Sequence, residues 1–158
     1  MNVWKTYTGE ILQGSLPVEV EKIIINELEQ GNELKLCIGT DSQVHGNRVD
    51  FATVVVFVRK KKGGRMLVSK FSEHRIIPIR ERMLLEVTHS IGVAYELMDI
   101  LTRYEIGLEV HADINSDPKF KSEPSLAEAK GYILGMGFEF KGKPDAFASS
   151  SCADKVVD

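Results

Sequence analysis

The first periodic pattern along the chain has a spacing of four residues. Val20, Ile24 and Leu28 are apolar at that spacing, which is typical of one face of a helix. Pro17 suits the first turn of such a helix, because its fixed backbone angle is helical and its missing N–H is not needed there. Gly31 follows the last apolar position and is typical of a helix C-terminus. The pattern therefore predicts an amphipathic helix near the N-terminus.

The pattern then changes to one that predicts three strands in succession. Apolar residues alternate over 34–38, β-branched and aromatic residues fill 51–59, and a return strand spans 66–77. Residues 60–64 contain three lysines and two glycines and form the turn between the last two strands. Residues 1–14 carry few periodic signals and are interpreted as an arm or a short strand. Because the connections are short, we expect an antiparallel meander.

Helical and strand patterns alternate in the second half of the chain. The longest helix is predicted over roughly 79–105, where apolar residues recur at spacings of three and four. A short strand over 108–113 follows it. A helix over 125–136 opens with the spacing of a capping box, and a last strand covers 138–140. Residues 149–157 resemble the opening of a final helix.

This order of elements predicts an α/β fold. The two later strands return through helices, so they should lie parallel to the first strand of the meander. The expected architecture is a five-stranded mixed sheet flanked by helices, with one extra helix at the N-terminus. We expect a single compact unit, in which residues 1–32 form the arm and helix and residues 33–158 form the main domain.

Composition narrows the class of protein without naming a function. The chain has 158 residues, 43% of them hydrophobic and 27% charged, and a net charge of -3, which is typical of a globular domain. Two cysteines are too few for a disulfide framework and favour a reducing cytoplasmic location. No apolar run approaches the length that spans a bilayer, so no membrane partner is expected. The small negative charge does not exclude nucleic acid.

Four acidic residues stand near the ends of predicted elements, and together they predict a site for divalent cations. Asp41 follows the first strand of the meander, and Asp113 ends the strand after the long helix. Glu86 lies on the long helix, and Asp154 in the first turn of the last one. Carboxylates that converge at a sheet edge repel one another unless cations lie between them. Hard divalent ions prefer such oxygen ligands.

Each acid also has a structural interpretation. Asp41 and Asp113 are both followed by residues typical of turns, where an aspartate bonds its own backbone. Glu86 could be a solvated helix residue, and Asp154 stands three residues after Ser151, the spacing of a capping box. The order strand, helix, strand, helix favours the metal site over four separate coincidences.

Three segments that contain these acids resemble a known family. They are Ile38-Gly39-Thr40-Asp41-Ser42-Gln43, Val110-His111-Ala112-Asp113-Ile114-Asn115, and Lys143-Pro144-Asp145-Ala146 running into Ser150-Ser151-Cys152-Ala153-Asp154-Lys155. Together the chain resembles the ribonuclease H-like superfamily, and within it the small YkuK-type proteins. The sequence departs from ribonucleases H in having no histidine after His111, only a stub of a final helix, and no long basic handle.

The resemblance implies a nuclease that uses two Mg²⁺ or Mn²⁺ ions to hydrolyse phosphodiester bonds of RNA, DNA or a hybrid. It implies that Asp41 bridges both ions, that Glu86 and Asp113 hold the ion on the leaving-group side, and that Asp154 completes the ion that activates water. Helix spacing favours Glu86 over Glu81, because Glu86 shares a face with Ser90. Glu81 and Asp145 are fallback ligands.

Two groups of basic residues are candidates for binding nucleic acid. Lys119, Lys121, Lys141 and Lys143 follow the last two strands, near the predicted acids, and we favour them over the basic hairpin tip at 59–62. Either group could instead be solvated. A zinc site with His111 and a cysteine has no supporting motif. The alternatives to a nuclease are a non-catalytic module that binds nucleic acid or protein, and a metal hydrolase for a small phosphorylated molecule.

Overall fold

The computed structural model describes residues 3–112, 124–142 and 145–157. It has an α/β fold in which one mixed six-stranded sheet has the order β1-β4-β3-β2-β5-β6. The strands are β1 (Trp4–Thr6), β2 (Leu34–His45), β3 (Arg48–Arg59), β4 (Gly63–Glu73), β5 (Gly107–His111) and β6 (Glu139–Lys141). The helices are α1 (Leu16–Glu29), α2 (Ile79–Arg103), α4 (Pro124–Gly135), a π-helical turn η1 (Ala148–Ala153) and α5 (Asp154–Val157).

The predicted meander and parallel returns are confirmed, but the number of strands was wrong. β2, β3 and β4 are antiparallel neighbours, while β5 and β6 run parallel to β2. The sheet has six strands instead of five, because residues 4–6 pair with the outer edge of β4. This pairing satisfies backbone groups that would otherwise stay exposed at the edge of the sheet. Of the two alternatives for residues 1–14, an arm or a short strand, the structure has the strand.

The first strand of the meander is much longer than the alternation at 34–38 predicted. β2 continues through Asp41 to His45, and Gly46 makes the turn with a φ of +62°. Asp41 therefore lies inside a strand and does not end it, as the sequence had suggested. β3 remains paired along the whole of β2, with Ala52 opposite Asp41. The described pairing of β5 with β2, in contrast, ends at Gly39.

Other boundaries shift by a few residues. The return strand ends at Glu73 instead of residue 77, while α2 ends at Arg103, close to the predicted 105. The final segment was expected to be a helix from 149, but it begins as the π-helical turn η1. Its α-helical part starts at Asp154 and covers four residues.

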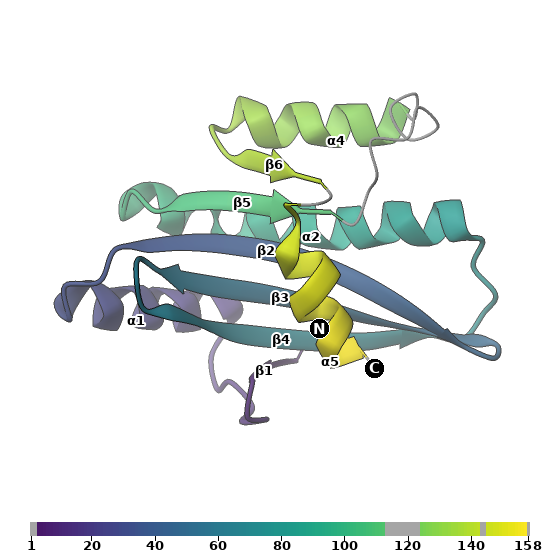
Figure 1. Cartoon of the computed structure of the whole chain (residues 1–158), viewed down its shortest axis with the longest axis horizontal. Coiled ribbons are helices and arrows are strands. Elements are labelled where there is room, and N and C mark those ends of the chain that lie inside the picture. Colours follow the sequence, from purple (N-terminus) through teal and green to yellow (C-terminus); the bar gives the residue numbers. More distant parts are fainter. Residues whose placement is uncertain (1–2, 113–123, 143–144, 158) are drawn as a thin grey trace.

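The two faces of the sheet carry different layers (Figure 1). α1 and α2 lie behind the sheet, whereas η1 and α5 lie in front of β2 and β3. Leu36 and Ile38 of β2 point to the α1–α2 side, where they join the main hydrophobic core. Cys37 points to the opposite side and packs with Ala148 and Ala153. Alternation along β2 therefore decides which side chains meet which layer.

Gly39 sets how closely η1 approaches the sheet. A Cβ at this position would lie 2.4 Å from the carbonyl carbon of Ala148 and from the amide nitrogen of Ser149. Such distances are far below van der Waals contact, so the backbone of η1 lies against β2 only because residue 39 has no side chain. This contact holds the start of the last segment two residues from Asp41.

Candidate functional site

β2 presents its polar residues alternately to the two layers. Thr40 and Ser42 face α2, because the Thr40 hydroxyl hydrogen-bonds that of Ser90 at 2.7 Å and Ser42 donates to Glu86. Asp41 lies between them and therefore faces η1 and α5. All three residues of β2 are buried. A carboxylate in this position has lost most of its water, which makes its negative charge costly without a cation or proton.

Glu86 is a buried glutamate on α2, with 8% of its surface exposed. Its carboxylate accepts a hydrogen bond from the hydroxyl of Ser42, the residue that follows Asp41. Burial raises the pKa of Glu86 to about 7, and the charge of Asp41 adds to this rise. The Ser42 hydrogen bond acts in the opposite direction. Glu86 is therefore close to Asp41 electrostatically and is partly protonated at neutral pH.

Asp154 approaches Asp41 from the other face of the sheet, where it is the exposed first residue of α5. Burial raises the pKa of Asp41, and a hydrogen bond with the Asp154 carboxyl raises it further. Two carboxyl groups can hydrogen-bond only when one of them is protonated. The Asp154 carboxyl therefore makes the negative charge of Asp41 more costly in the metal-free protein, and a divalent cation bound there would offset that cost.

Arg82 is a positively charged neighbour of these acids that the sequence did not reveal. It lies one helical turn before Glu86, and its charge lowers the pKa of both Asp41 and Glu86. Its Nε is buried and has no hydrogen-bond partner in the part of the chain that the structure describes. The spacing of four from Glu86 was the available signal, because residues four apart share a helix face.

The remaining predicted residues fall into two groups. Glu81 is exposed and lies 3.1 Å from Arg75 in an ion pair, Asp145 is exposed, and Lys141 pairs with Glu139 at 3.3 Å. Four predicted residues lie outside the described ranges: Asp113, Lys119, Lys121 and Lys143. The structure thus brings together Asp41, Glu86 and Asp154, and it leaves Glu81 occupied with an arginine.

A second polar cluster lies on the η1 side of β2 and β5. It consists of Cys37, Glu109 and His111, all buried, whose ligand atoms lie within 4.8 Å of one another. Among the described residues no other trio of possible metal ligands is so close, and Asp41, Glu86 and Asp154 are more widely spaced. Geometry alone would therefore place a metal ion in this second cluster.

The hydrogen-bonding pattern of this cluster argues against a bound metal ion. Nδ1 of His111 accepts a hydrogen bond from the backbone N–H of Ala148 at 3.0 Å, so the proton of the neutral ring is on Nε2. Nε2 lies 2.9 Å from Glu109, which also binds Lys35 at 2.9 Å. A metal on Nε2 would force a proton onto Nδ1, facing the Ala148 N–H. The cluster is better described as a hydrogen-bonded anchor for η1.

The protonation of the cluster supports this description. Burial raises the pKa of the Cys37 thiol to about 12, with the charge of Glu109 adding to the effect, so the thiol is protonated in the metal-free protein and a metal ion would have to displace its proton. Burial also lowers the pKa of His111, which keeps the ring neutral. The donor set of Asp41, Glu86 and Asp154, in contrast, consists only of oxygen, as Mg²⁺ and Mn²⁺ prefer.

The mixed sheet with helices on both faces, and carboxylates meeting at its central strand, define an α/β protein of ribonuclease H type. Residues 19–158 match the family described as Ribonuclease H-like, and the chain belongs to that family. A curated relative is the uncharacterised protein YkuK of Bacillus subtilis strain 168. It is 31% identical over 136 residues, which cover 77% of this chain and 78% of the relative.

Two solved structures are similar at lower identity. Ribonuclease H1 from the halophilic archaeon Halobacterium salinarum NRC-1 is 15% identical, with a TM-score of 0.44, and the match covers 78% of this chain and 98% of that one. The N-terminal ribonuclease H domain of rv2228c from Mycobacterium tuberculosis, solved as a fusion with maltose-binding protein, is 13% identical with a TM-score of 0.41. That match covers 80% of this chain and 95% of the other. Among the described residues, no helix is long and apolar enough to cross a membrane.

Proposed function

We propose that this protein is a divalent-metal-dependent nuclease that hydrolyses phosphodiester bonds. The observation that carries the proposal is that the buried carboxyl of Asp41 interacts electrostatically with Glu86 of α2 and with Asp154 of α5, while Ser42 hydrogen-bonds Glu86. Membership of the ribonuclease H-like family supports a nuclease or a related nucleic-acid function. The proposed ligands are Asp41, Glu86, Asp154 and Asp113, and the proposed metal is Mg²⁺ or Mn²⁺.

The residues of the site have distinct tasks in this proposal. Asp41 presents its carboxylate from the rigid centre of the sheet, and Ser42 holds the carboxylate of Glu86 in place beside it. Asp154 would supply a further carboxylate from the α5 side of the sheet. When bound, a pair of divalent ions lowers the pKa of the attacking water and neutralises charge on the leaving 3′ oxygen. Arg82 contributes positive charge that favours the ionised forms of Asp41 and Glu86.

The direct test is incubation of the protein with end-labelled single-stranded RNA, single-stranded DNA and an RNA–DNA hybrid. The expected result is cleavage with Mg²⁺ or Mn²⁺ that EDTA abolishes and that Asp41→Asn and Glu86→Gln both lose. Asp99→Asn and Glu96→Gln are matched controls, because these acids are exposed on α2 and the chemical changes are the same. Cleavage that survives in Asp41→Asn would contradict the proposal.

The second candidate is a nucleic-acid-binding module that does not cleave. The spacing of Asp41, Glu86 and Asp154 favours it, since they form a looser group than the buried cluster of Cys37, Glu109 and His111. Titration calorimetry of the metal-free protein with Mn²⁺ separates the two candidates. The nuclease requires binding that Asp41→Asn removes, whereas the module requires no divalent ion.

A further inference from the structure

The sheet face that carries α5 is hollowed along the side of that helix away from β5. Three hollows of about 640, 630 and 420 Å³ follow one another there. The first two share Thr6, Tyr7 and Lys155, and the second and third share Lys70. We refer to this continuous depression as the α5 groove and define it by Lys5, Tyr7, Lys70 and Lys155.

The register of the sheet connects this groove to the acids of the proposed metal site. Asp41 pairs with Ala52, and Ala52 pairs with Lys70, so the three residues form one row across β2, β3 and β4. Directly paired residues point to the same face of a sheet. Two strand spacings place the Cα atoms of Asp41 and Lys70 roughly 10 Å apart. A chain of phosphates that entered the groove at Lys70 would thus pass close to the carboxylates.

The groove concentrates positive charge in a protein whose net charge is -3. Lys5 pairs across the sheet with Val68, two residues before Lys70, which puts both lysines on the same face. Lys155 reaches in from α5. Lys5, Lys70 and Lys155 are exposed, and none of them forms an ion pair with an acidic residue that the structure describes.

The acidic residue that lines these hollows has its negative charge balanced by a neighbouring arginine. Among the described lining residues this is Asp50, which pairs with Arg48 at 2.9 Å and accepts a hydrogen bond from Ser72 at 2.6 Å. These contacts lower the pKa of Asp50, so it is ionised and its charge is balanced within the protein. The three lysines of the groove are therefore available to bind an anionic partner.

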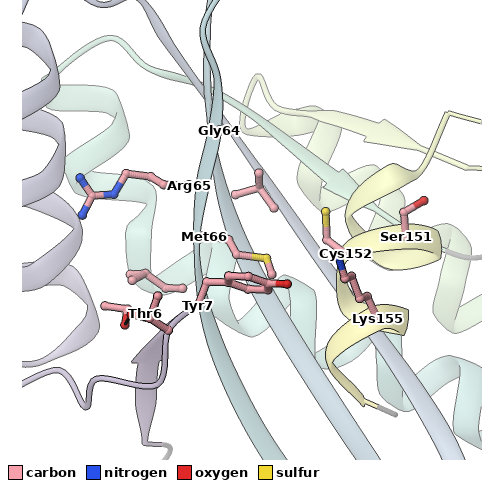
Figure 2. A pocket seen from close by; sticks show the side chains of 11 residues that line it. Thr6, Tyr7, Gly64, Arg65, Met66, Ser151, Cys152 and Lys155 are labelled. Carbon is pink, nitrogen blue, oxygen red and sulfur yellow. Dashed lines mark hydrogen bonds between the residues drawn. The ribbon is translucent and has the colours of Figure 1, made fainter.

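An exposed aromatic ring stands in the middle of the groove. Tyr7 is 55% exposed, and the ammonium group of Lys155 lies over its ring at 6.0 Å from the centroid. Figure 2 shows this ring and the Lys155 side chain facing the same hollow, beside Met66 and Cys152. An aromatic face among lysines suits an unpaired base whose flanking phosphates contact the ammonium groups.

We infer that the α5 groove binds single-stranded nucleic acid, with phosphates on Lys5, Lys70 and Lys155 and a base on Tyr7. This inference deepens the proposed nuclease function and rests on it for the path that leads the strand to Asp41. A duplex does not offer the unstacked base that Tyr7 would contact, so a single strand is the stated occupant. The hairpin lysines at residues 60–62 are not among the described residues that line the three hollows.

The test measures the affinity of a labelled 12-residue oligouridylate by fluorescence anisotropy over a range of salt concentrations. EDTA is present throughout, so that binding does not depend on cleavage. The variant carries Lys5→Gln, Lys70→Gln and Lys155→Gln, and the matched control carries Lys60→Gln, Lys61→Gln and Lys62→Gln. Both triple variants change the net charge equally, and circular dichroism confirms that each is folded.

The expected result is a loss of about two units of slope in log affinity against log salt for the groove variant, at roughly 0.7 per phosphate contact. The hairpin control should keep the wild-type slope. Tyr7→Leu should weaken binding about fivefold or more at an unchanged slope, since it removes stacking and no charge. Equal losses in both triple variants, or no binding by the wild type, would overturn the inference.

Two further arms separate the groove from its alternatives. Polyglutamate should compete poorly with the oligonucleotide, and equal competition would show that the groove recognises acidic polymers in general and overturn the nucleic-acid assignment. A cleavage assay run in parallel distinguishes the two proposals. If the wild type cleaves and the groove variant binds as tightly as the wild type, the groove inference is wrong and the nuclease proposal stands. Groove-dependent binding without metal-dependent cleavage would support the groove and contradict the nuclease.

Discussion

The hydroxyl of Ser42 donates a hydrogen bond to the carboxylate of Glu86 and so joins β2 to α2 beside Asp41. Both groups are buried, and the bond crosses from the sheet to the helix layer. A buried carboxylate needs such a donor, because it has lost the water that would otherwise solvate it. The stability of the protein and the placement of Glu86 therefore depend on the same contact.

We expect Ser42→Ala to lower the free energy of unfolding by about 1–3 kcal/mol, because it leaves a buried carboxylate without its donor. Ser69→Ala is the matched control. The Ser69 hydroxyl is also buried, but it has no partner among the described residues, so its removal should be neutral or slightly stabilising. Urea unfolding at pH 7 measures both. Equal losses in the free energy of unfolding of the two variants would show that the Ser42–Glu86 hydrogen bond does not stabilise the protein.

We expect Asp41→Asn to remove Mn²⁺ binding at the bridging position while the fold survives. At pH 8 without metal, the free energy of unfolding of the variant should equal that of the wild type or exceed it by about 1 kcal/mol. The reason is that the change removes one negative charge from a group of carboxylates. Calorimetry with Mn²⁺ and thermal unfolding measure the two effects. A strongly unfolded variant, or one that binds Mn²⁺ like the wild type, would contradict the role of Asp41.

The pH dependence of stability should reveal the buried acids. Glu86 has a pKa of about 7 in the folded protein, against an ordinary value of 4.5, and the pKa of Asp41 is raised as well. Between these values the folded state holds more protons than the unfolded state. The stability that these groups contribute is therefore fully present below about pH 4 and is lost as pH rises towards and through 7.

This prediction is checked by urea unfolding from pH 4.5 to 8.5 in EDTA. His89 and His111 have lowered pKa values and contribute with the opposite sign, so the test compares wild type with a variant carrying Asp41→Asn and Glu86→Gln. The variant should lose less stability as pH rises, and saturating Mn²⁺ should flatten the wild-type curve in the same range. Parallel curves for wild type and variant would refute the assignment.

We expect His111→Ala to loosen the last segment of the chain. The change removes the acceptor of the Ala148 N–H and the partner of Glu109, and it leaves a cavity, so the free energy of unfolding should fall by about 2–4 kcal/mol. Hydrogen exchange should increase most in η1 and α5. His74→Ala is the control, because His74 is exposed. Unchanged exchange in η1 would show that the anchor lies elsewhere.

Local patterns in the sequence predicted the elements better than their lengths. The apolar stripe of the long helix placed α2 within two residues at its C-terminus, and Pro17 placed the start of α1. The turn residues around Asp41 misled the prediction for β2. Pairing with β3 supplies a partner for every residue there, so a distant strand overrode the local preference for a turn.

The site was predictable only where the order of elements carried information. Asp41, Glu86 and Asp154 were selected by their places after or within predicted elements, and in the structure Asp41 interacts electrostatically with each of the other two, while their role as ligands stays a prediction. Arg82 was missed because a helical pattern in the sequence does not show whether the Nε of an arginine is buried. A zinc site of His111 and Asp113 with Cys37 or Cys152 was considered from the sequence, and only the hydrogen bond from the Ala148 N–H fixes the His111 proton that argues against a metal on Nε2.

The contact between Gly39 and η1 means that the site joins parts of the chain made at very different times. Asp41 and Glu86 belong to elements that can pair soon after they are synthesised, because β2, β3, β4 and α2 follow one another directly. The N-terminal part of a chain is made first during synthesis. Asp154 must wait for the last segment to settle on Gly39. Under the proposed nuclease function, a nascent chain on a ribosome, surrounded by RNA, would thus hold an incomplete centre until that segment docks.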